Sequence, residues 1–178
     1  MFQEYWSADG RSLLILGAGG LGEEVAEIAQ MTGQYSRIAF LDDSKKVHRA
    51  ILGGIAEAEE LTGEFPFAIC AIGNNEARMR MHRRLKEIGY RIPTLIHPAA
   101  SVSPTAKLGD GCIVRAGAVI SRNVCMEDAC LINIHAAIDH GCVIGEGSHI
   151  PMGCVVRNEV RLPALSVFRP NQVIETNE

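Results

Sequence analysis

The sequence predicts an α/β domain followed by a parallel β-helix. This prediction rests on two periodic patterns in the second half of the chain and one glycine motif in the first half. In the second half, a large apolar residue recurs at every sixth position through fourteen repeats: Ile96, Val102, Leu108, Val114, Ile120, Met126, Ile132, Ile138, Ile144, Ile150, Val156, Leu162, Phe168 and Ile174. A small or compact residue lies two positions before each of them, from Thr94 to Ser166, and only Gln172 breaks this second pattern. In the first half, Gly17-Ala18-Gly19-Gly20-Leu21-Gly22 directly follows a short apolar run.

The first half has the pattern of an α/β unit. It predicts, in order, a strand at Leu13–Leu16, a helix from Glu23 to about Met31, a strand at Ile38–Leu41, an ambiguous segment in which Ile55–Leu61 could be a helix, a strand at Phe67–Ile72 and a helix near Ala77–Ile88. This is one mononucleotide-binding half of a Rossmann-like sheet, which we assign to residues 1–92.

The glycine motif lies where a nucleotide-binding loop is expected, after a strand and at the start of a helix. Its glycines allow a tight turn and let backbone N–H groups approach a phosphate. Asp42, about 20 residues further on, suits a ribose hydroxyl in the NAD interpretation. We favour a nucleotide-sugar over NAD because only one mononucleotide half is present and no redox domain follows. A tight turn without a ligand is the alternative.

The spacing of six in the second half is neither the 3.6 of a helix nor the 2 of a strand. It is typical of hexapeptide repeats, in which three hexapeptides form one triangular coil. The apolar residue points into the prism, and the small residue lies near a corner, where bulk would block the turn. Coils stack at the strand spacing of about 4.8 Å, and parallel strands buried in this way need a dry aliphatic interior. We expect this domain at residues 93–178.

Composition excludes several classes of partner. With 17 Lys+Arg against 21 Asp+Glu, the chain has no basic field for nucleic acid or anionic membrane. No signal peptide and no apolar run of roughly 18 residues is visible, so no membrane partner is expected. The six cysteines include no CxxC pair, and four of them occupy the small-residue positions, so reduced thiols in a cytoplasmic protein are expected. His135, His140 and His149 are not spaced to stack on 18-residue coils, so we expect no metal site.

Five motifs, taken in order, resemble one family. They are Gly17–Gly22, Phe40-Leu41-Asp42-Asp43-Ser44-Lys45, Ala71-Ile72-Gly73-Asn74-Asn75-Glu76, Leu95-Ile96-His97-Pro98 and Ile138-Asp139-His140. This order is similar to that of the UDP-4-amino-sugar N-acetyltransferases of bacterial glycan synthesis, the bacillosamine type, and their sialic-acid O-acetyltransferase relatives. The resemblance covers nearly the whole chain and implies the left-handed form of the β-helix, as in the hexapeptide acyltransferases.

The resemblance implies that the first domain holds a UDP-amino-sugar. Asp42 and Asp43 would contact the uracil or ribose, and Lys45 and the loop amides would face the diphosphate. The implied substrate-binding residues in this domain are Gly17, Gly19, Gly20, Gly22, Asp42, Asp43, Lys45, Asn74 and Asn75.

The resemblance also implies a homotrimer whose β-helices build acetyl-CoA sites between subunits. His140 matches the catalytic base, and Asn133 matches a polar residue of the sugar pocket. His149, Gly153 and Asn158 would lie at the acetyl-CoA, with a backbone N–H near Asn158 binding the oxyanion. Three apolar residues outside the inward pattern (Val119, Val124 and Val143) are expected on the intersubunit face.

Three features depart from the family pattern. Leu21 replaces a histidine of the glycine loop, Gly141 replaces an acidic residue after the base, and the tail-like segment at 166–174 arrives several coils early. Asp139 or a water would then orient His140. The leading expectation is acetyl transfer from acetyl-CoA to the 4-amine of a UDP-amino-sugar. The alternatives are O-acetylation of a sialic-acid-type sugar and a non-catalytic nucleotide-sugar-binding paralogue.

Overall fold

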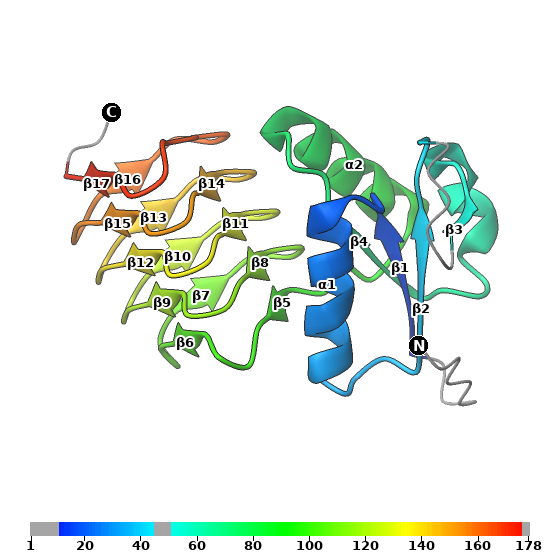
Figure 1. Cartoon of the computed structure of the whole chain (residues 1–178). Helices are drawn as coiled ribbons and strands as arrows, with labels where there is room; N and C mark the ends of the chain where they lie inside the picture. The colour runs from blue at the N-terminus through cyan, green and yellow to red at the C-terminus, as the bar shows by residue number, and fades with distance from the viewer. Residues whose placement is uncertain (1–10, 45–50, 176–178) are drawn as a thin grey trace. The chain divides into compact units, whose positions relative to one another are not determined.

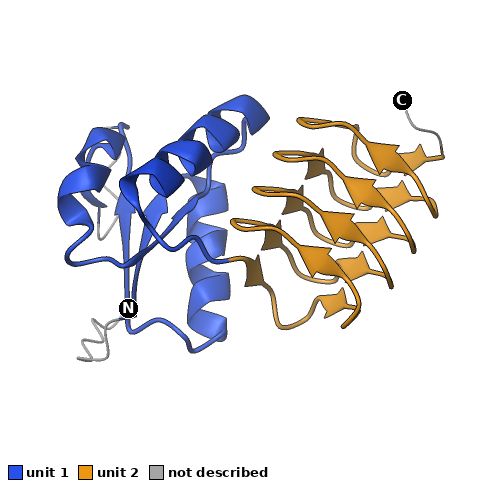
Figure 2. Ribbon diagram, turned by 180° about the vertical axis from the view of Figure 1, so that it is seen from behind, with its two compact units in different colours: residues 1–93 blue, residues 94–178 orange. Residues whose placement is uncertain are grey.

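The computed structural model describes residues 11–44 and 51–175, and the chain divides into two compact units, Met1–Pro93 and Thr94–Glu178 (Figure 2). Each unit has its own apolar core.

Unit 1 is a parallel four-stranded sheet with helices. Its elements are β1 (Ser12–Leu16), α1 (Gly20–Met31), β2 (Arg37–Leu41), β3 (Ile51–Gly53), the 3₁₀ helix η1 (Ile55–Leu61), β4 (Phe67–Cys70) and α2 (Asn75–Ile88) (Figure 1). The strand order is β3-β2-β1-β4. Helix α1 packs on β1, α2 on β4, and η1 on β2. All three predicted strands and both predicted helices are present, and Ile55–Leu61 is helical.

Two details of unit 1 differ from the sequence expectation. Strand β3 was not predicted, because it has only three residues and pairs with β2 through an irregular register. Helix α1 begins at Gly20, inside the glycine motif, and α2 begins at Asn75, because Asn74 caps it: the Asn74 side chain accepts a hydrogen bond from the Ala77 N–H at 2.9 Å.

Unit 2 is a parallel β-helix of two-residue strands. They are β5 (Leu95–Ile96), β6 (Ser101–Val102), β7 (Lys107–Leu108), β8 (Ile113–Val114), β9 (Val119–Ile120), β10 (Cys125–Met126), β11 (Leu131–Ile132), β12 (Ala137–Ile138), β13 (Val143–Ile144), β14 (His149–Ile150), β15 (Val155–Val156), β16 (Arg161–Leu162) and β17 (Val173–Ile174). They form three flat sheets, ordered β14-β11-β8-β5, β17-β15-β12-β9-β6 and β16-β13-β10-β7. Paired residues are 18 apart, as in Cys125↔Val143, so each coil contains three hexapeptides (Figure 1).

The interior of the prism confirms both periodic patterns. The every-sixth apolar residues from Val114 to Val156 and the small apolar residues from Cys112 to Cys154 form one buried cluster, and Ser148 of the small-residue pattern is also buried. One expectation was wrong: Val124 is only 1% exposed, because it belongs to the small-residue pattern and packs inside. Val119 and Val143 are more exposed but lie on different sheets, in β9 and β13. These three valines therefore form no common face.

A third pattern with period six marks the corners. Residues with φ between 54° and 72° recur at Gly111, Gly117, Asn123, Ala129, His135, Gly141, Gly147, Gly153, Glu159, Leu165 and Asn171. Glycine tolerates this left-handed conformation best, and asparagine and histidine tolerate it better than most residues.

Glycine and non-glycine residues alternate along the stack of coils at these corners. A Cβ on Gly141 would lie 3.3 Å from Cγ of Glu159, which is one coil further on. In the same way, a Cβ on Gly117 would meet the ring of His135, and one on Gly153 would meet the amide of Asn171. A glycine in one coil thus makes room for the side chain in the next. Gly141 follows this corner pattern, which gives a structural reason for a glycine after His140.

Candidate functional sites in the two units

The glycine loop turns from β1 directly into α1, and its glycines have different roles. Gly17 has φ +106°, and a Cβ there would lie 2.8 Å from the Ala71 carbonyl oxygen; a Cβ on Gly22 would overlap the Gly17 carbonyl. These two positions require glycine for packing. A Cβ on Gly19 or Gly20 would meet no atom within 4 Å. The N-terminus of α1, whose first N–H groups have no intrahelical acceptor, is therefore open to an anion.

The aspartates that follow β2 hold backbone groups. Asp42 accepts hydrogen bonds from the N–H of Ala18 at 2.6 Å and of Ser44 at 2.7 Å. These bonds lower the pKa of the Asp42 carboxyl below its ordinary value, and the bond from Ala18 has the largest effect. Asp43 accepts from the Ile55 N–H at 2.8 Å and so fixes the start of η1. Each carboxylate keeps further acceptor positions for a ligand. Lys45 lies outside the described residues.

The two asparagines after β4 are also held within the fold. Asn74 caps α2, and the side-chain oxygen of Asn75 accepts from the Arg78 guanidinium at 2.9 Å. Arg78 is fully buried and also donates to the carbonyl oxygens of Ile72 and Gly73, at 3.1 and 3.2 Å. Arg78 was not predicted; the available signal was a cation within the buried face of α2, one turn before His82 and two turns before Leu85. Arg78 shapes the loop that carries both asparagines.

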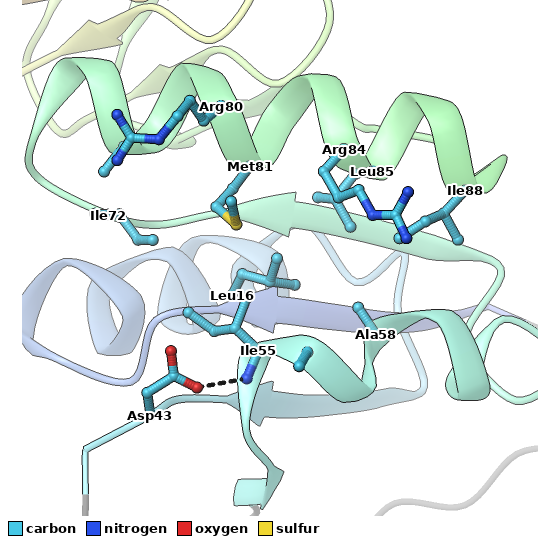
Figure 3. Close-up of a pocket in the computed structure, with 12 residues that line it drawn as sticks. Leu16, Asp43, Ile55, Ala58, Ile72, Arg80, Met81, Arg84, Leu85 and Ile88 are labelled. Carbon is cyan, nitrogen blue, oxygen red and sulfur yellow. Dashed lines mark hydrogen bonds between the residues drawn. The ribbon is translucent and has the colours of Figure 1, made fainter.

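A groove of about 430 Å³ lies between η1 and α2 over the sheet (Figure 3). Its lining is mostly apolar, from Leu16, Ile55, Ala58, Ile72, Met81, Leu85 and Ile88. Asp43 lies at the η1 side, and Arg80 and Arg84 project from α2 on the opposite side (Figure 3). Of the unit 1 residues that were predicted as a site and that the structure describes, only Asp43 lines this groove. Its apolar walls and few charged groups suit a planar polar heterocycle.

His140 lies at the corner of the prism that joins β12 to β13. The Asp139 carboxylate accepts a hydrogen bond from the backbone N–H of His140 at 2.7 Å, and the His140 carbonyl accepts from the Glu159 N–H at 2.9 Å. Within the described residues, no hydrogen bond to the His140 ring is found. Asn158 is one coil above His140 in the register of β12 and β15. This corner therefore presents an imidazole with the Asn158 loop above it.

Asn133 and His149 form the second polar group of unit 2. Asn133 follows β11 and is only 9% exposed, and its amide nitrogen lies 3.2 Å from Nε2 of His149 in β14. The amide oxygen accepts from the Ile134 N–H at 2.8 Å and from the guanidinium of Arg115. Arg115 was not predicted, although it precedes Asn133 by one coil of 18 residues. Gly153 lies at the corner between the β14 and β15 strands.

Within one chain, the predicted unit 2 residues fall into two sets. His140, Asp139 and Asn158 lie at the corner after the β12 and β15 strands, whereas Asn133, His149 and Gly153 lie on the β11–β14 face and the corner that follows it. In the described part of the chain, no cluster of three or more His, Cys, Asp or Glu side chains suited to a metal ion is found. Among the same residues, no helix is long and apolar enough to cross a bilayer.

Comparisons with known proteins agree with this architecture. Residues 12–85 match the family described as PglD N-terminal domain. UDP-N-acetylbacillosamine N-acetyltransferase of Bacillus subtilis (strain 168) is 31% identical over 116 residues, which are 60% of this chain and 52% of that protein. The chain thus spans about half the length of this curated relative.

Two solved structures resemble most of the chain. The acetyltransferase domain of PglB from Neisseria gonorrhoeae FA1090 is 32% identical, with 86% of each chain covered and a TM-score of 0.77. PerB from Caulobacter crescentus, solved in complex with CoA and GDP-perosamine, is 27% identical. The match covers 91% of this chain and 82% of the PerB chain, with a TM-score of 0.72. The protein therefore belongs to the bacillosamine-type family of sugar N-acetyltransferases, with an α/β N-terminal domain and a left-handed parallel β-helix.

Proposed function

We propose that the protein transfers the acetyl group of acetyl-CoA to the 4-amine of a UDP-amino-sugar, with His140 as the general base. The observation that carries the proposal is the presence in one chain of an open glycine loop, in unit 1, and an accessible histidine at a β-helix corner, in unit 2, in a family whose named relatives are acetyltransferases.

Unit 1 supplies two parts of a nucleotide site. The open N-terminus of α1 at Gly19 and Gly20 suits the diphosphate. The groove beside Asp43 suits uracil, whose flat ring would lie between the apolar side chains of η1 and α2. A carboxylate oxygen of Asp43 would accept the imino N–H of the base. Arg80 from α2 would add positive charge for the phosphates.

Unit 2 supplies the base. The sugar amine attacks the thioester carbonyl carbon, the new C–N bond forms, and the C–S bond breaks as the CoA thiolate leaves. The amine must lose a proton in this step, and a neutral imidazole accepts protons near neutral pH. The proton taken by His140 then passes to the departing thiolate. A backbone N–H near Asn158, one coil above, would bind the oxyanion.

A homotrimer would complete the site. His140 and the Asn133–His149 pair lie at different parts of one prism, so a single chain does not bring them together, and a second β-helix beside the first would. The β6–β9–β12–β15–β17 sheet carries an exposed apolar stripe, with Val119, Val155 and Val173 exposed by 42%, 37% and 53%. Such a stripe favours burial against another copy.

Sedimentation of two matched variants tests the trimer. Val155→Glu places a charge in this stripe and should yield monomers, whereas Val143→Glu, on the β13 sheet, should leave the wild-type state unchanged. A wild-type protein that sediments as a monomer at micromolar concentration would contradict the trimer and the shared site.

The activity is tested by incubating the protein with acetyl-CoA and a panel of UDP- and GDP-linked amino-sugars and sialic-acid-type sugars, while following free thiol. We expect thiol release with a UDP-4-amino-sugar and a product acetylated on nitrogen by mass spectrometry. Release only with a sialic-acid-type sugar would indicate O-acetylation. Nucleotide-sugar binding without any thiol release would indicate a non-catalytic binding protein.

A further inference from the structure

The hydrogen-bond partners of Asn133 allow its side-chain amide only one orientation. Its oxygen is approached by the Arg115 guanidinium and the Ile134 backbone N–H, and both of these groups can only donate. The amide oxygen must therefore face them, and the NH₂ group must face Nε2 of His149, 3.2 Å away. Because Asn133 is 9% exposed, water offers little competition for these bonds.

This orientation decides the protonation of His149. An amide NH₂ group can only donate, so Nε2 of His149 has to accept, and an accepting ring nitrogen carries no proton. The ring is then neutral, with its one proton on Nδ1. An imidazolium, or the tautomer protonated on Nε2, would place two donors against each other at this contact.

We propose that Arg115 is a positioning residue of the unit 2 site, which acts through the Asn133 amide to hold His149 as the neutral tautomer protonated on Nδ1. In this state His149 has no lone pair left to accept a proton from a substrate, and it serves as a hydrogen-bond donor. The division of roles rests on the proposed function: His140, whose ring has no hydrogen bond within the described residues, takes the proton, and His149 does not.

The first test needs no substrate. The full-length protein labelled with ¹⁵N-histidine, with His149 assigned through His149→Gln, should show a protonated Nδ1 and an unprotonated Nε2 at pH 7.5. Asn133→Asp replaces the NH₂ group with an acceptor oxygen, so the Nε2 signal should become that of a protonated nitrogen. A wild-type Nε2 that is already protonated would overturn the inference.

The second test isolates Arg115. Arg115→Met should replace the single tautomer of His149 by a mixture, and Arg115→Lys, which keeps a cationic donor, should restore it at least in part. Arg122→Met is the matched control, because Arg122 is an exposed arginine on a neighbouring turn, and it should leave the His149 signals unchanged. Unchanged signals in a folded Arg115→Met protein would remove Arg115 from this role.

Steady-state kinetics test whether the tautomer of His149 affects acetyl transfer. Arg115→Met should lower kcat by about tenfold while leaving the KM for the nucleotide-sugar nearly unchanged, because the nucleotide contacts lie in unit 1. An unchanged kcat in a folded Arg115→Met protein would contradict the positioning role. If the wild-type protein has the Nδ1-protonated tautomer but transfers no acetyl group, the proposed function fails and the account of Arg115 stands.

Discussion

The two units differ in how the polar side chains of the proposed site relate to the rest of the fold. In unit 1, the groups at the ends of the strands are tied into the fold: Asp42 holds the glycine loop, Asp43 holds η1, and Asn74 caps α2. In unit 2, the core is a repeating aliphatic stack, and the corner residues His140 and Asn158 take little part in it. The proposed binding residues of unit 1 therefore also serve stability, whereas His140 and Asn158 of unit 2 contribute little to the core.

The largest expected effect is at a corner of unit 2. His140→Ala removes the proposed base without touching the core, so kcat should fall by roughly 10²–10⁴, while UDP binding measured by calorimetry stays nearly unchanged. His135→Ala is the control, since His135 fills a corner position above Gly117, and it should have a much smaller effect. Near-normal turnover of His140→Ala would mean that another group deprotonates the amine.

The corresponding change in unit 1 targets the N-terminus of α1, where the diphosphate is proposed to bind. Gly19 has φ −77° and open space around it, so Gly19→Val should fold. Its side chain would occupy the space before α1, and UDP affinity should fall by about 10²-fold, or about 2.7 kcal/mol. Gly63→Val, at another glycine with no atom within 4 Å of a Cβ, should leave UDP affinity unchanged. Tight NADH binding with no UDP signal would reverse the nucleotide assignment.

A smaller effect tests the packing of the corners. Gly117→Ala imposes φ +68° on an alanine and pushes its methyl group against the His135 ring, so the free energy of unfolding should fall by about 2 kcal/mol. Adding His135→Gly removes the contact but not the backbone strain. Urea unfolding of the four proteins should give a coupling of about 1 kcal/mol. Strictly additive effects would show that the two residues do not press on each other.

The smallest effect is a pH dependence in unit 1. Since hydrogen bonds from Ala18 and Ser44 lower the pKa of Asp42, its stabilising contribution is complete above the ordinary value of 3.8 and is lost as the pH falls through the folded-state value. Asp42→Asn should cost about 1 kcal/mol at neutral pH, because this carboxylate is partly solvated. The difference from wild type should shrink below pH 3.8, and a constant difference down to pH 2 would contradict the assignment.

Periodicity explains how much the sequence could predict. In unit 2, the inward residues and the strand positions follow from a spacing of six, and the Arg115–Asn133 contact could have been found by adding 18. The contact between Asn133 and His149 could not have been found in this way, because the two residues are 16 and not 18 positions apart, and their contact depends on side-chain conformation. In unit 1, strands β1, β2 and β4 and helices α1 and α2 followed from apolar runs, whereas the three-residue strand β3 did not. The groove depends on how η1 and α2 lie over the sheet, and no local pattern encodes that arrangement. The error at Val124 came from treating a small-pattern residue as a surface one.

The alternation at the corners bears on how such a chain can change length. The coil at 123–140 has side chains at all three left-handed positions, the coil at 141–158 has three glycines, and the coil at 159–175 again has three side chains. Loss of 141–158 alone would stack Glu159 on Asn123, Leu165 on Ala129 and Asn171 on His135. Duplication of the two coils at 123–158, 36 residues at the observed spacing of 18, keeps each of these side chains next to a glycine of the adjoining coil. The unit of growth in this β-helix is therefore a pair of coils.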